Sequence, residues 1–149
     1  MPGRRALILT SFAAALVSSL PGVPLAETYF TDNGLALRGY DPVAYFQQAR
    51  PVRGTPEHSL HWGGAEWRFA SAENRAAFVA APEAYAPQYG GYCAWAVSQG
   101  YTAPIDPNAW RIVDGRLYLN YSRSIHRRWE RDIPGHIQRA DANWPALGG

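Results

Sequence analysis

Residues 110–119 read WRIVDGRLYL, and this stretch predicts a β-hairpin. Its two flanks, residues 110–113 and 116–119, are four-residue runs of mainly aromatic and branched aliphatic side chains. Asp114-Gly115 between them suits a two-residue turn of the type whose two central positions both need a positive φ. The chain therefore contains an antiparallel ribbon in its last third.

A second hairpin is predicted upstream of this ribbon. Residues 60–62 (LHW) and 67–69 (WRF) are short alternating runs, and the turn signal GGAE at 63–66 joins them. Because neighbouring side chains of a strand point to opposite faces, His61 is expected on the face opposite to Leu60 and Trp62.

Residues 43–46 (VAYF) are predicted to form a short apolar strand after the Asp-Pro turn at 41–42. Ser71 is a suitable N-cap for a helix over residues 72–80, and Pro82 is expected to stop that helix.

Residues 94–98 predict one further helical turn, with Gly100 as its terminator. A last helix is expected from Ser124, kinked at Pro134 and ended at Trp144-Pro145. Its apolar positions recur every four residues: Ile125, Trp129, Ile133 and Ile137. Together these elements predict an α+β fold, with small antiparallel hairpins and a few helices packed on them.

The N-terminus predicts export. Residues 1–5 are basic, residues 6–20 are uncharged and apolar, and this apolar run is too short to span a bilayer. We expect a signal peptide at 1–26 that is cleaved after Ala26, and its Arg4-Arg5 pair is compatible with a twin-arginine signal. Residues 27–149 then form one domain that is periplasmic or secreted.

Composition excludes several functions. The chain has no lysine, so all fourteen of its Lys plus Arg residues are arginines, against twelve Asp plus Glu. Removing residues 1–26 takes away two arginines, so the remaining twelve balance the twelve acids and indicate no nucleic-acid partner. Without lysine, Schiff-base catalysis and a P-loop are excluded. No segment after residue 26 is apolar enough to be expected to span a membrane.

Several of these motifs together resemble the YHS-domain family, and the resemblance covers nearly all of residues 34–147. The matching stretches, in order along the chain, are GYDPVAYF (39–46), WRFASAENR (67–75), YAPQYGGYCA (85–94), LYLNY (117–121), WERDIPG (129–135) and ANWP (142–145). The ending is similar to that of exported bacterial members of the family. The resemblance therefore implies a single YHS-type domain.

The YHS family is in turn similar to small metal-binding domains whose motif carries three cysteines. Ala44, Ala70 and Arg75 (or a neighbour of Arg75) stand where those cysteines are expected, so the sulfur ligands are absent here. Cys93, with His61 and His58, is the replacement set that we consider for copper or zinc, because one thiolate and two imidazoles suit either ion.

Cys93 is the only cysteine, which is unusual in an exported protein. If residues 94–98 are helical, Cys93 sits at the helix N-terminus, where a thiolate is stabilised, and a thiol-dependent enzyme that uses Cys93 is one alternative. The other alternative is a buried structural thiol that acts as a small hydrophobic side chain.

Tyr89, Tyr92 and Trp95 surround Cys93 in the sequence and are the predicted ligand-binding residues, since aromatic rings often line ligand grooves. They fit core packing equally well. We favour a binding or accessory protein over an enzyme. Its predicted partner is a small ligand, a metal ion or an envelope protein.

Overall fold

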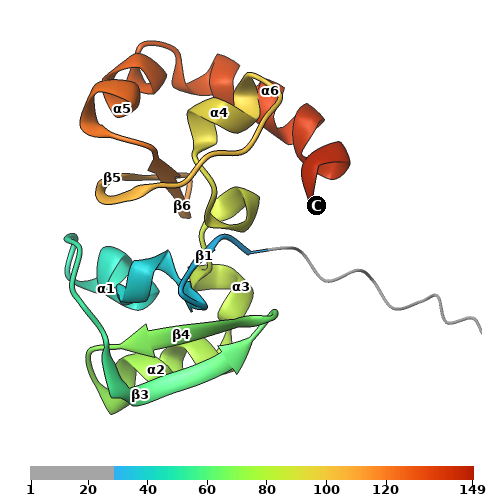
Figure 1. The fold of residues 1–149 in the computed structure, drawn as a ribbon. Helices are drawn as coiled ribbons and strands as arrows, with labels where there is room; N and C mark the ends of the chain where they lie inside the picture. Colours follow the sequence, from blue (N-terminus) through green and yellow to red (C-terminus); the bar gives the residue numbers. More distant parts are fainter. Residues whose placement is uncertain (1–28) are drawn as a thin grey trace, which may run out of the picture.

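The computed structural model describes residues 29–149, so the predicted signal peptide lies outside the described residues. These residues form two small sheets covered by helices, which confirms the predicted α+β class. Figure 1 shows one half built on the first sheet and the other on a two-stranded ribbon. Within this part of the chain, no helix is both long and apolar enough to cross a membrane.

The first sheet is four-stranded, in the order β1-β2-β4-β3. Its strands are β1 (Thr31–Asp32), β2 (Leu35–Ala36), β3 (Thr55–Trp62) and β4 (Ala65–Phe69). The β3–β4 pair is the predicted antiparallel hairpin, whereas β2 lies parallel to β4, a pairing that the hairpin pattern did not predict. His61 is exposed on the face away from the core, as the alternation requires.

The predicted strand at residues 43–46 is wrong, because this segment is part of helix α1 (Pro42–Gln47). The side chain of Asp41 accepts hydrogen bonds from the backbone N–H groups of Val43 (2.8 Å) and Ala44 (3.3 Å). Pro42 then occupies the first helical turn, where its missing N–H costs nothing. The Asp-Pro pair is thus a helix start and not the predicted turn.

Helix α2 (Ala72–Ala80) has Ser71 as its N-cap, as predicted, and is followed by the single turn α3 (Pro82–Tyr85). Between residues 29 and 149, two 3₁₀ segments lie outside these helices, η2 (Leu37–Gly39) and η3 (Gln88–Gly91). The predicted turn after residue 93 is α4 (Ala94–Ser98).

The predicted β-hairpin consists of β5 (Asp106–Val113) and β6 (Arg116–Asn120). Asp114 and Gly115 have φ values of 51° and 76°, as a two-residue turn of this kind requires.

The last helix is two helices, which corrects the prediction of one kinked helix. Helix α5 (Arg123–Glu130) ends before Asp132, whose side chain caps α6 (Ile133–Leu147) by accepting from the N–H of Gly135. Pro134 lies in the first turn of α6, where proline is tolerated, and α6 continues past Pro145.

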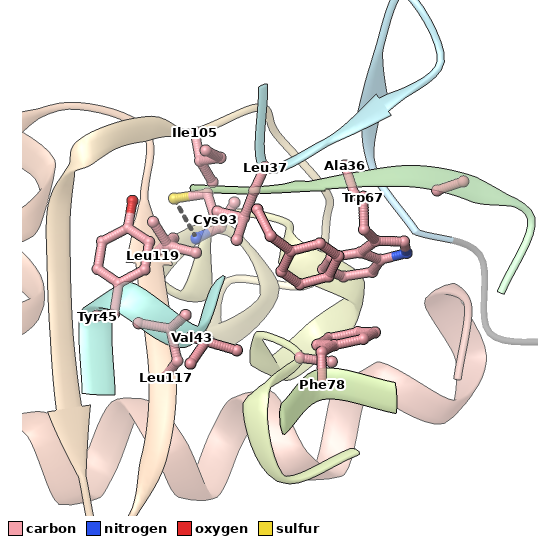
Figure 2. Packing of buried hydrophobic residues seen from close by; sticks show 14 residues of the cluster. Ala36, Leu37, Val43, Tyr45, Trp67, Phe78, Cys93, Ile105, Leu117 and Leu119 are labelled. Carbon is pink, nitrogen blue, oxygen red and sulfur yellow. Dashed lines mark hydrogen bonds between the residues drawn. The ribbon is translucent and has the colours of Figure 1, made fainter. Parts of the chain in front are cut away.

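The two halves share one hydrophobic core. Val43, Phe69 and Trp67 from the first half are in the same cluster of buried side chains as Leu117 and Leu119 of β6. Figure 2 shows Val43, Leu117 and Leu119 close together near Cys93. A second cluster joins α4, α5 and α6, so the segment from residue 93 to 98 contacts both cores.

Candidate functional site

Cys93 occupies the N-cap position of α4 and is only 1% exposed. Its sulfur accepts hydrogen bonds from the backbone N–H groups of Ala96 (3.5 Å) and Tyr121 (3.2 Å). In Figure 2 the sulfur lies near Ile105 and the dashed line marks the bond from Ala96. The thiol is therefore buried and engaged by the backbone of two different elements.

Burial raises the pKa of the Cys93 thiol above its ordinary value, and the hydrogen bonds from nearby backbone N–H groups only partly oppose this effect. A thiol with a raised pKa carries little thiolate near neutral pH. The position at a helix start, which favours an activated nucleophile, is outweighed here by desolvation.

Asn120, fully buried at the end of β6, connects Cys93 to an imidazole. Its Oδ1 accepts a hydrogen bond from the N–H of Trp95 at 2.9 Å and lies 3.6 Å from the Cys93 sulfur. Its Nδ2 lies 3.0 Å from His126 Nδ1. Since the amide is the donor in that contact, the ring proton of neutral His126 is on Nε2, which faces a Glu130 oxygen at 3.4 Å.

This network places an amide between the thiol and the His126 imidazole. Burial lowers the pKa of His126 more than the Glu130 carboxylate raises it, so the neutral ring is favoured. The amide of Asn120 does not titrate and so does not carry a proton from sulfur to ring nitrogen. The arrangement positions the Cys93 side chain without supplying the base that a thiol enzyme needs.

A pocket of about 460 Å³ opens beside Cys93, between α4 and the start of α5. We call it the Cys93 pocket. Two of its aromatic residues are exposed large hydrophobic side chains, Tyr101 at 48% and Tyr121 at 55%. The side chains around it are Cys93, Trp95, Ala96, Tyr101, Ala103, Tyr121, Ser122, Ser124 and Ile125. Among these described residues, only the thiol and the two tyrosines are ionisable.

The predicted metal ligands do not come together. His58 and His61 lie on β3, which Figure 1 places in the half of the molecule away from α4, the helix that Cys93 caps. Within residues 29–149, no group of three or more His, Cys, Asp or Glu side chains is arranged to hold a metal ion. The prediction of copper or zinc at Cys93, His58 and His61 thus gains no support from the geometry.

The three predicted ligand-binding aromatics lie in different places. Trp95 lines the Cys93 pocket and packs edge-to-face against Tyr101 at 6.4 Å. Tyr89 lines a different pocket, and Tyr92 packs against Phe30 at a ring distance of 5.7 Å. The sequence cluster is therefore split, and only Trp95 of the three belongs to the pocket beside the cysteine.

The positions at which the family resemblance implies cysteines do lie together, around a carboxylate. Oδ1 of Asp41 accepts from the N–H of Ala44, while Oδ2 accepts from the N–H of Ala70 at 2.8 Å and from Asn74 Nδ2 at 2.7 Å. Asn74 is the neighbour of Arg75, the third position. In this chain, the buried Asp41 carboxylate holds these three segments together.

Comparisons of the chain with protein-family models, with curated proteins and with solved structures gave no match. The resemblance to the YHS-domain family stays a prediction that these comparisons do not test.

Sequence reasoning missed Asn120 and the pocket residues that follow it. The available signal was Asn120 itself, a polar residue at the end of the apolar run LYLN at 117–120. In a strand that is packed on both faces, such a side chain is buried and needs a hydrogen-bond partner. His126 is recognisable in the sequence only as a helix residue, because its contact with Asn120 depends on how α5 packs on β6.

Proposed function

We propose that this protein is an exported binding protein of the YHS type, whose Cys93 pocket takes an uncharged and largely apolar small molecule. The observation that carries the proposal is the lining of that pocket. Trp95, Tyr101 and Ile125 offer apolar area, and Ser122 and Ser124 offer hydroxyl groups. Ligand sites in proteins combine an apolar lining with a few polar groups in this way, at comparable volumes.

Charge supports an uncharged ligand. The guanidinium of Arg128 lies over the Trp95 ring at 5.8 Å from its centroid. This cation already interacts with the Trp95 ring, and the side chains that line the Cys93 pocket are uncharged. A charged ligand would lose its hydration without a charged partner in the pocket, and this is costly.

The state of Cys93 favours binding over catalysis. The thiol is neutral, hydrogen-bonded to backbone N–H groups and linked to His126 only through an amide. Its role in this proposal is to form part of the pocket wall and to fix the start of α4. The thiol-enzyme alternative would need a thiolate and a base in direct contact.

The pocket is tested with N-phenyl-1-naphthylamine, an uncharged probe whose fluorescence rises in apolar surroundings. Ala103→Phe places a ring in the pocket, while Ala76→Phe makes the same change at an exposed position on α2. We expect saturable binding to the wild type and to Ala76→Phe, and binding about tenfold weaker to Ala103→Phe. Equal affinities of the two variants, or no saturable binding to the wild type, would contradict the proposal.

Metal handling and export are tested on the same material. Mass spectrometry of the untagged protein from the periplasm, beside Cys93→Ser, measures copper and zinc; near-stoichiometric metal that disappears in the variant would replace this proposal by a metal site. N-terminal sequencing of that material tests export, since cleavage after Ala26 leaves Glu27 as the first residue.

A further inference from the structure

A second pocket, of about 370 Å³, lies between the end of the first half and helix α6. We call it the Trp144 pocket. It differs from the Cys93 pocket because charges of both signs surround it together with aromatic rings. The residues that carry the argument are Tyr29, Glu83, Tyr89, Arg116, Asp141 and Trp144.

The aromatic part of this pocket comes from distant segments of the chain. Tyr89 belongs to η3, where it is held at φ 57° and buried, and its ring is 6.2 Å from that of Trp144 on α6 at an interplanar angle of 66°. Tyr29 contributes a third ring from the start of the described chain. The faces of such rings carry negative potential and attract cations, ammonium groups included.

The charged part is built around Asp141. The Tyr89 hydroxyl donates to its Oδ1 at 2.8 Å, and burial together with this carboxylate raises the pKa of Tyr89, so the hydroxyl remains a donor. The second carboxylate, Glu83, comes from α3, and the cation Arg116 comes from the start of β6. The ion pairs found within residues 29–149 involve other side chains, so the charges of these three are not paired with one another.

We propose that the Trp144 pocket binds a small zwitterion, with its ammonium group against the carboxylates and aromatic rings and its carboxylate against Arg116. A simple cation would meet the rings and both acids but would leave Arg116 without an anionic partner and close to a like charge. A simple anion would meet two carboxylates. A molecule that carries both charges satisfies both sides of the pocket, and the volume suits a ligand the size of an amino acid or a betaine.

The test compares glycine betaine with choline by isothermal titration calorimetry. The two probes share the trimethylammonium group, and only betaine has the carboxylate. We expect betaine to bind about fivefold more tightly than choline, since one partly exposed charge pair contributes up to about 1 kcal/mol. Arg116→Gln should remove this advantage and leave the affinity for choline unchanged or higher.

Asp141→Asn keeps the oxygen that accepts from Tyr89 and removes the negative charge, so both probes should bind about fivefold more weakly. Both substituted residues are exposed, and their thermal unfolding should match that of the wild type. Ala103→Phe, in the other pocket, should leave betaine binding unchanged, which separates this inference from the proposed function. It is overturned if betaine shows no saturable binding, or if Arg116→Gln weakens choline and betaine equally.

Discussion

Replacing Asp41 by alanine should strongly destabilise this protein. The Asp41 carboxylate is completely buried and accepts four hydrogen bonds, which come from the N–H groups of Val43, Ala44 and Ala70 and from the Asn74 amide. Alanine leaves all four donors without this acceptor in a largely buried site.

The magnitude follows from these contacts. Loss of the N-cap of α1 costs about 0.5–2 kcal/mol. Each of the other two donors, on Ala70 and Asn74, is left unsatisfied at a cost of about 1–3 kcal/mol. We therefore expect Asp41→Ala to lower the free energy of unfolding by about 2.5–8 kcal/mol, which is much of the stability of an ordinary domain. Asp41→Asn should lie in between, because its amide nitrogen faces two donors whichever way it is turned.

Urea unfolding followed by tryptophan fluorescence measures this loss as a shift of the midpoint. The matched control is Asp106→Ala, because Asp106 also precedes a proline, but its carboxylate accepts its hydrogen bonds within the described residues from Asn108, two positions on, at the surface. We expect the control to cost less than about 1 kcal/mol. A midpoint for Asp41→Ala that equals that of Asp106→Ala would refute the reasoning.

Three further predictions concern reactivity, pH and packing. Cys93 should react with iodoacetamide at least about tenfold more slowly in the folded protein than in urea, since burial raises its pKa and blocks access; equal rates would contradict a buried thiol. Burial lowers the pKa values of His126 and His136, so the unfolded chain binds protons more readily than the folded protein. The free energy of unfolding should therefore be highest above about pH 6.5, the ordinary pKa of histidine, and should decrease as the pH falls below that value. In urea titrations at a series of pH values, His136→Gln should reduce the pH dependence of the free energy of unfolding. An unchanged pH dependence would show that His136 does not contribute to it. Gly54→Ala should lower the melting temperature or prevent folding, because an added Cβ would overlap the backbone carbonyl group of Arg68; an unchanged melting temperature would contradict this.

The elements that sequence predicted well are those with local turn or cap chemistry. Asp114-Gly115 specifies its hairpin, and Ser71 specifies the start of α2, because in both cases the decisive interaction is within a few residues. The prediction for residues 43–46 failed because a four-residue apolar run has no distinguishable period, and its helical state depends on Asp41 acting as an N-cap.

The candidate site was predictable only in part. Cys93 was expected at a helix start, and it is the N-cap of α4. Its contacts with Asn120 and Tyr121 join residues 27 and 28 positions apart, and no local pattern encodes them. The same limit applies to Tyr89 and Trp95, which are six residues apart in sequence yet line different pockets, because the chain turns through left-handed positions at residues 89–91.

The core shared by the two halves has a consequence for the order of events during synthesis. Val43, Phe69 and Trp67 are made early, but the leucines that complete their cluster, Leu117 and Leu119, come late in the chain. Hydrophobic stabilisation is proportional to the apolar area removed from water, so a nascent chain that ends before residue 117 has an open core. We therefore expect the core of the amino-terminal half to close only once residues 117–119 are available to pack against it.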